Sequence, residues 1–262
     1  MTAAHPAYGS LREVTPHAAV LLCDNPSVMT LEGTNTWVLR APGSQQCLVV
    51  DPGPDIDEHL HRVARVGDVV ATVLTHGHAD HAGGARRFAE LTGAPVRAVD
   101  PAHRYGSEGL VEGDVLEGAG VVLRVLATPG HTADSVCLML QADGEAASVL
   151  TGDTVLGRGT TVIDPRDGEL GAYLASLRRL AALPADTTVL PGHGPELADA
   201  ATVARQYLAH REQRLEQVRS ALLTLGADAT AAQVVALVYA DVDRALWPAA
   251  EWSVRAQLDY LR

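Results

Sequence analysis

The strongest constraint on what this chain can fold into is the segment Thr75–His81, with the sequence THGHADH. It contains three histidines and one aspartate directly after the apolar run VVATVL. On a turn that leaves a strand, alternate positions place His76 and His78 on one side, while Asp80 and His81 lie on the other as a helix begins. Imidazole and carboxylate together suit Zn, Fe or Mn, whereas Ca and Mg prefer oxygen ligands. The segment therefore predicts a metal site at the end of a buried strand.

Further candidate ligands follow three other apolar runs. His131 comes after GVVLRVLATPG, Asp153 after SVLTG and His193 after TTVLPG. Each lies beside glycine, where tight turns let the backbone and the side chain approach a metal closely. Four strands would then each deliver ligands at their carboxyl ends. We therefore expect one rim of the sheets to collect five histidines and two aspartates.

Short runs rich in β-branched residues occupy the first two-thirds of the chain. Turn residues bound each run, which predicts buried strands, and helical patterns lie between them. This alternation predicts an α/β fold in which helices cover the sheets. The predicted strands are Gln46–Val50, Asp68–Leu74, Gly120–Leu126, Ala147–Leu150 and Thr187–Leu190, and the predicted helices are Ile56–Arg65, Ala82–Leu91 and Ala172–Leu183.

The pattern changes near Pro195, beyond which the chain is predicted to be helical. Apolar residues recur near helical spacing over Glu196–Leu225. A second helix is predicted after Asp228 or Thr230, and a third over Ala249–Leu261. A unit of about 65 residues is too small to hold a large core alone. We therefore expect it to pack on the main domain.

Composition narrows the classes of function. The chain has 262 residues and a net charge of −12, and all 20 of its cationic residues are arginine, which disfavours a protein that coats polyanions or anionic membranes. Its three cysteines (Cys23, Cys47 and Cys137) are scattered, so no disulfide framework is expected. No apolar stretch reaches the roughly 18–20 residues of a membrane span, and the N-terminal sequence lacks an export signal. A soluble cytoplasmic protein is expected.

The metal motifs resemble those of the metallo-β-lactamase-fold hydrolases, in which His-x-His-x-Asp-His precedes a distant His, Asp and His. The matching stretches are THGHADHAGG (75–84), TPGHTADS (128–135), TGDT (151–154) and PGHG (191–194). NPSVMTLEGTNTWVL (25–39) and GDTVLGRGTTVI (152–163) resemble the group that contains beta-lactamase-like protein two. The resemblance implies a four-layer αββα sandwich over residues 1–198, followed by a small helical, winged-helix-like unit over residues 199–262.

Carried over position by position, the resemblance implies a binuclear zinc centre, for which Fe or Mn are alternatives. Asp80 would orient the attacking water and shuttle its proton, and Asp51 would accept a hydrogen bond from a ligand histidine. Two metals about 3.5–4 Å apart lower the pKa of a shared water, which would attack an ester-type or phosphodiester bond. The implied ligands are His76, His78 and His131 for one metal, Asp80, His81 and His193 for the second, and Asp153 as the bridge.

Four residues are candidates for substrate contact at the rim of the site. Asn35 and Thr36 belong to the GTNT segment, and Arg158 and Thr160 to the GRGTT loop. A turn, cap or plain loop role fits each of them about as well. Asp51 precedes Pro-Gly, which is also typical of a simple turn.

The motifs specify the fold more closely than the substrate. The best-studied member of the resembling group cuts single-stranded RNA, so an RNA endonuclease is one hypothesis. A glyoxalase-II-like thioesterase or a lactonase, acting on a small-molecule ester or thioester, is the alternative. A mononuclear-iron dioxygenase that shares half of the ligand set and a non-enzymatic binding module are further alternatives. Acids outnumber arginines between residues 196 and 262, so the tail shows no basic stripe for nucleic acid. The substrate and the oligomeric state stay open.

Overall fold

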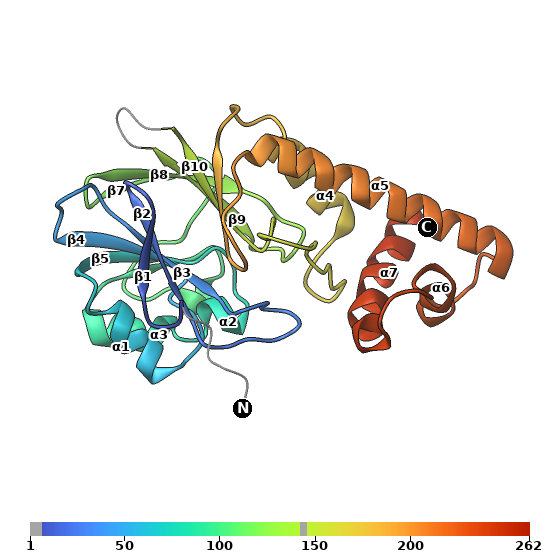
Figure 1. Ribbon diagram of the computed structural model, residues 1–262, viewed down its shortest axis with the longest axis horizontal. Coiled ribbons are helices and arrows are strands. Elements are labelled where there is room, and N and C mark those ends of the chain that lie inside the picture. The colour runs from blue at the N-terminus through green and yellow to red at the C-terminus, as the bar shows by residue number, and fades with distance from the viewer. Residues whose placement is uncertain (1–6, 142–145) are drawn as a thin grey trace.

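The computed structural model describes residues 7–141 and 146–262, which form two packed sheets with helices on their outer faces (Figure 1). The first sheet has the order β1 (Leu11–Thr15), β2 (Ala18–Leu22), β3 (Asn35–Leu39), β4 (Gln46–Val50), β5 (Asp68–Val73) and β6 (Val96–Arg97). The second has the order β11 (Thr188–Pro191), β10 (Ser148–Gly152), β9 (Val136–Gln141), β8 (Val121–Ala127) and β7 (Val115–Gly118). The helices are α1 (Asp57–Val63), α2 (Ala79–Ala82), α3 (Ala85–Thr92), α4 (Leu170–Leu180), α5 (Ala200–Leu225), α6 (Ala231–Val238) and α7 (Trp247–Leu261), with 3-10 turns at Pro101–His103 and Arg244–Leu246.

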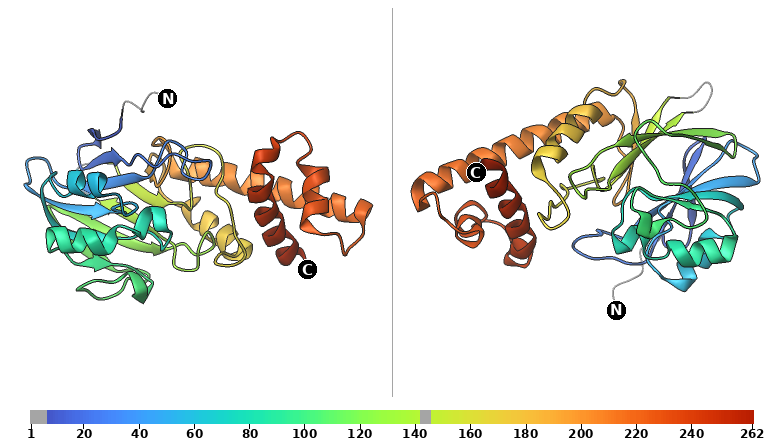
Figure 2. Two further views of the ribbon diagram at one scale, coloured as in Figure 1. Left: turned by 90° about the horizontal axis from the view of Figure 1, so that it is seen from below. Right: turned by 180° about the vertical axis from the view of Figure 1, so that it is seen from behind.

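Three apolar layers hold these elements together. Leu39 and Val50 of the first sheet share one buried cluster with Leu123 and Leu138 of the second, so the main core lies between the sheets. α1 and α3 cover the outer face of the first sheet, while α4 and α5 cover that of the second (Figures 1 and 2). This arrangement confirms the αββα sandwich.

Strand directions place the predicted ligands at one edge. β4 and β5 are parallel, and so are β10 and β11, while β8 and β10 both pair antiparallel with β9. The carboxyl ends of β4 and β5 therefore lie on one side of the first sheet, and those of β8, β10 and β11 lie on one side of the second. The loops that leave these ends carry the candidate metal ligands.

Two predicted helices differ from the observed ones. The expected helix Ala82–Leu91 is divided into α2 and α3, because the Gly84 amide donates to Gly53 O at 2.9 Å and not to a carbonyl of the preceding helical turn. The expected helix from Glu196 begins only at Ala200. The carboxylate of Asp199 accepts hydrogen bonds from two backbone amides of the first turn, which is a typical N-cap.

The C-terminal helices form a small apolar cluster of their own. Val218 and Ala221 of α5 pack there with Val234 of α6 and Val254 of α7. The first half of α5 instead belongs to the cluster on the second sheet, so one helix is shared by both (Figure 1). The predicted division between residues 198 and 199 falls where this helix begins, and it stays a prediction. Across residues 7–141 and 146–262, no helix combines the length and the apolar character needed to cross a membrane.

We predict that His59 makes the fold sensitive to acid. His59 is 5% exposed, and its Nε2 lies 2.8 Å from the hydroxyl oxygen of Thr36. Burial, together with the charge of Arg62, lowers the pKa of His59 from 6.5 to about 4. As the pH falls, the His59 ring therefore takes up a proton in the unfolded chain before it does so in the folded chain. The free energy of unfolding is unaffected by this group above pH 6.5 and decreases by about 3 kcal/mol as the pH falls to 4.

Urea unfolding of wild type and His59→Gln at neutral pH and near pH 4 tests this expectation. Between the two pH values the unfolding free energy of the variant should fall by about 3 kcal/mol less than that of wild type. His61→Gln, at an exposed position of the same helix, is the matched control and should behave as wild type. Equal pH dependence in wild type and His59→Gln would contradict the assignment.

Candidate metal centre

The segment after β5 divides its side chains between the interior and the surface. His76 and His81 are buried, while the side chains of His78 and Asp80 are 36% and 27% exposed. His78 has an extended backbone and caps the beginning of α2, so the chain changes direction there. One short segment thereby offers candidate ligands to two neighbouring cation sites.

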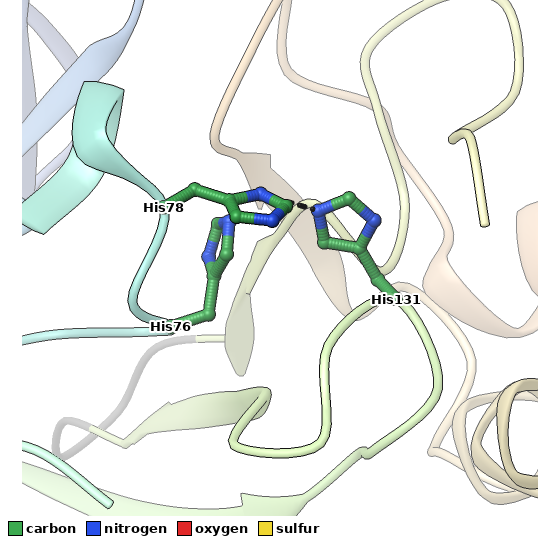
Figure 3. A group of neighbouring side chains, drawn as sticks. All are labelled: His76, His78 and His131. Atoms are coloured by element: carbon green, nitrogen blue, oxygen red, sulfur yellow. Dashed lines mark hydrogen bonds between the residues drawn. The ribbon is translucent and has the colours of Figure 1, made fainter. Parts of the chain in front are cut away.

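The remaining predicted ligands come from strand ends of the second sheet. His131 follows β8, Asp153 follows β10 and His193 follows β11. The candidate ligand atoms fall into three groups, and within each group they lie within 4.8 Å of one another. The groups are His76, His78 and His131 (Figure 3); His76, His81 and Asp153; and Asp80, His81 and His193. The structure thus brings all the predicted ligands together in what we call the histidine cluster.

Asp153 lies between the two ends of the histidine cluster. Its Oδ2 is 3.4 Å from His193 Nε2 and 3.7 Å from His131 Nε2, and its Oδ1 is 3.4 Å from His81 Nε2. The absence of a side chain at Gly192 leaves room for the Asp153 carboxylate, because a Cβ at residue 192 would lie 2.6 Å from Asp153 Oδ1. The carboxylate therefore lies where one ligand could serve two cations.

Each imidazole of the cluster uses its outer nitrogen to bond an oxygen. These contacts are His76 Nδ1 with Thr75 Oγ1 (3.0 Å), His78 Nε2 with Asp167 Oδ2 (2.9 Å), His81 Nδ1 with Asp51 Oδ2 (2.8 Å), His131 Nδ1 with Val162 O (2.9 Å) and His193 Nδ1 with Gly33 O (3.0 Å). Carbonyl and carboxylate oxygens only accept, and the Thr75 hydroxyl already donates to Asp51. When the rings are neutral, the ring proton therefore lies on each outer nitrogen, and the lone pair of the inner nitrogen faces the cluster.

These inner nitrogens approach one another closely. His78 Nδ1 is 3.1 Å from His131 Nε2, and His81 Nε2 is 3.2 Å from His193 Nε2. When both rings of a pair are neutral, neither has a proton left to share with the other. Two lone pairs at this separation repel each other, and a cation between them removes the repulsion.

Two further candidate ligand atoms lack hydrogen-bond partners. Among the described residues, His76 Nε2 and Asp153 Oδ1 are buried and make no hydrogen bond. A buried polar atom without a partner costs free energy, and a native structure rarely keeps one without a reason. The nitrogen and oxygen donors of the cluster therefore fit bound cations of the zinc, iron or manganese type.

The charges differ between the two ends of the cluster. Burial lowers the pKa of His76 well below its ordinary value, so this ring is neutral. Burial also lowers the pKa of His193, but Asp153 and Asp80 outweigh it and raise the value to about 9. For Asp153, burial raises the pKa, whereas His193 and His81 outweigh burial and hold it well below its usual range. The buried carboxylate stays ionised and attracts positive charge.

Asp51 supports the cluster from behind. It is 1% exposed and adopts a left-handed backbone with φ of 52°. Its Oδ1 accepts from Thr75 N at 2.8 Å and its Oδ2 from the Thr75 hydroxyl at 2.7 Å, in addition to the contact with His81. Such a backbone is unfavourable for a residue with a side chain and persists because these contacts hold it.

Asn35 and Thr36 lie outside the histidine cluster. The Asn35 amide donates to Pro191 O at 3.0 Å and to Gly194 O at 2.8 Å, so it fastens β3 to the loop that carries His193. Thr36 is fully buried and bonds His59. These contacts give both side chains a role within the fold, and substrate contact stays a prediction.

Arg158 and Thr160 lie on the loop that follows Asp153. Arg158 is exposed and forms an ion pair with Glu32, while Thr160 is half-buried. Neither belongs to the histidine cluster. Their contact with substrate stays a prediction.

The oxygens that orient four of the imidazoles were not predicted from the sequence, the Thr75 hydroxyl among them. Gly33 and Val162 act through backbone carbonyls, which leave no residue-type signal. Asp167 lies in the segment DPRDG, which is typical of a turn, and only its closeness to His78 distinguishes it from a turn former.

Residues 29–193 match the model of the metallo-beta-lactamase superfamily, a range that contains every residue of the histidine cluster. Residues 230–262 match the beta-lactamase associated winged helix domain.

Known relatives and solved structures agree with these matches. The chain is 34% identical to the atrochrysone carboxyl ACP thioesterase of Aspergillus fumigatus over 80% of its own length and 66% of the relative. It is 32% identical to a beta-lactamase-like protein 2 homolog of Caenorhabditis elegans, over 90% of its length and 78% of the relative. Its fold resembles a beta-lactamase domain protein from Burkholderia ambifaria with a TM-score of 0.78 at 27% identity, covering 98% of this chain and 90% of the other.

We predict that the protein binds two divalent cations per chain. Elemental analysis after dialysis against Zn²⁺ should give two equivalents for wild type and one for His131→Ala, which removes a nitrogen from only one end of the cluster. His17→Ala changes a histidine outside the cluster and should keep two equivalents. A single equivalent in wild type would contradict the two-cation arrangement.

Proposed function

This chain belongs to the metallo-beta-lactamase superfamily of hydrolases, and from that premise we propose that it uses two cations to hydrolyse thioesters. The observation that carries the proposal is that ring nitrogens face each other closely at both ends of the histidine cluster, with Asp153 between them. His76, His78 and His131 would hold one cation and Asp80, His81 and His193 the other, with Asp153 shared. Two such cations, when bound, lower the pKa of a water toward neutrality and polarise the substrate carbonyl.

Asp80 is the residue of this chain best placed to handle the proton of the attacking water. Burial raises the pKa of Asp80, but His81 and the bond with His193 outweigh burial and lower it, so the carboxylate is ionised. It is 27% exposed, and its Oδ2 lies 3.1 Å from His193 Nε2. The water oxygen would bond to the carbonyl carbon while Asp80 takes the proton. As the carbon–sulfur bond breaks, that proton would pass to the departing thiolate.

Charges beside the cluster favour an uncharged acyl group. The segment after Asp153 carries two arginines, and each is paired: Arg158 with Glu32, and Arg166 with Asp164. A polyanionic substrate needs unpaired cations that can release counterions. The thioesterase named among the relatives also supports an acyl thioester.

RNA cleavage is the second candidate, because the C-terminal residues match a winged helix domain. Single-stranded RNA would then be the partner of that unit. The net charge of −12 and the paired arginines make this the less favoured candidate.

A panel of substrates separates these candidates. Protein with a measured cation content is assayed with an acyl thioester, an oxygen ester, a lactone, a phosphodiester and a short single-stranded RNA. We expect the highest kcat/KM for the thioester, and a higher value for RNA would overturn the substrate class. One iron per chain together with oxygen consumption would instead indicate a mononuclear-iron dioxygenase.

We predict that Asp80→Ala lowers kcat for the thioester at least about a hundredfold, because the proton acceptor is lost. The melting temperature should change little, since the side chain is partly exposed. Steady-state kinetics and thermal unfolding are measured on preparations with verified cation content. Turnover close to wild type in such a preparation would remove Asp80 from the mechanism.

A further inference from the structure

The outer nitrogen of His78 bonds a carboxylate to which the sequence analysis assigns no role. His78 Nε2 lies 2.9 Å from Asp167 Oδ2, and the two side chains are 36% and 45% exposed. The other imidazoles of the histidine cluster are buried, at 6% exposure or less. Packing therefore holds those rings in place, whereas His78 is free on one side and depends more on its hydrogen bond.

Asp167 is held firmly despite its exposure. It lies in a turn closed by Asp167 N to Asp164 O at 3.2 Å and Gly168 N to Asp164 O at 2.7 Å. Its own carbonyl accepts from Ala133 N at 2.9 Å, and Glu169 N donates to Gly130 O at 2.9 Å. The turn is thus fastened on both sides to the loop that carries the next ligand of the same group.

We propose that Asp167 is a positioning residue for the cation site formed by His76, His78 and His131, a proposal that rests on the proposed function. Its carboxylate accepts a hydrogen bond from the Nε2–H group of His78, which fixes the tautomer and aims the Nδ1 lone pair at the other two rings. The turn fixes the carboxylate relative to the His131 loop, so both ligands keep one mutual geometry. Partners of this kind typically change metal affinity by about 10- to 100-fold when they are removed.

A charge effect is the competing explanation, because any carboxylate near the rim attracts cations. Asp134 provides the comparison within the chain. It lies at the same rim, where its Oδ2 is 3.2 Å from the position of a Cβ at Gly77, and its Oδ1 accepts from the Thr132 hydroxyl. Asp134→Asn therefore removes a nearby negative charge and leaves the His78 bond intact.

The test measures cation affinity directly. Co²⁺ is titrated into metal-free wild type, Asp167→Asn, Asp167→Ala and Asp134→Asn against a chelator of known affinity, and the visible absorption of the bound ion is followed. We expect Asp167→Ala to lose about 10- to 100-fold at the site that contains His78, and the other site to change less than about threefold. Asp167→Asn should lose less than Asp167→Ala, since its amide oxygen still accepts from Nε2. Asp134→Asn should match wild type within about threefold.

A second measurement separates positioning from stability. Long-range ¹⁵N–¹H spectra of Zn²⁺-loaded wild type should show His78 protonated at Nε2. In Asp167→Ala the same spectra should show an average of the two tautomers of the His78 ring. Thermal unfolding of the metal-free forms checks that the variants are folded. Two results would overturn the role of Asp167 and leave the cation site standing. One is a Co²⁺ affinity within threefold of wild type for both Asp167 variants, and the other is a loss of affinity in Asp134→Asn equal to that in Asp167→Ala. Failure of wild type to bind Co²⁺ overturns the proposed cation site and this inference with it.

Discussion

The structure depends on imidazole nitrogens held facing one another at short distances. In the first pair the inner nitrogens of His78 and His131 are 3.1 Å apart, and in the second those of His81 and His193 are 3.2 Å apart. Neutral rings would turn to avoid the repulsion between facing lone pairs, but the bonds made by their outer nitrogens prevent the rotation. The fold thus holds an arrangement that is unfavourable by itself and favourable around cations, which is the meaning of a preorganised site.

The acceptors that orient these rings are distant in sequence. Gly33 lies 160 residues from His193, and Asp167 lies 89 residues from His78. Gly33 belongs to the loop before β3 of the first sheet, whereas His193 follows β11 of the second. The ligand is therefore oriented only when the two sheets have packed against each other. Ligand geometry at this site is a property of the whole sandwich, and cation binding should accordingly favour the folded state.

The convergence of the candidate ligands was predictable because these residues are local features of the sequence. Polar residues at the ends of apolar strands converge when strand directions agree, and the sequence pattern contains that information. The predicted strand Gln46–Val50 has the observed bounds of β4 for the same reason. The division of the helix at Gly84 and the bonds of Asn35 depend on backbone groups of remote loops. No residue type marks such groups, so pattern and spacing could not reveal them.

The longest helix explains how the C-terminal unit contributes to the centre. The chain from Asp153 to Ile163 forms no helix or strand, although much of it is buried, so its backbone needs partners from elsewhere. The hydroxyl of Tyr207 on α5 accepts from the backbone N–H of Leu156 at 3.0 Å and donates to the carbonyl oxygen of the same residue at 3.2 Å. Arg211 of the same helix is 3% exposed and donates to the Thr161 carbonyl. The next carbonyl along the chain, that of Val162, is the one that His131 bonds. Because α6 and α7 pack on the far half of α5, they stabilise the helix that orders this loop. The C-terminal unit therefore supports the histidine cluster through a shared helix.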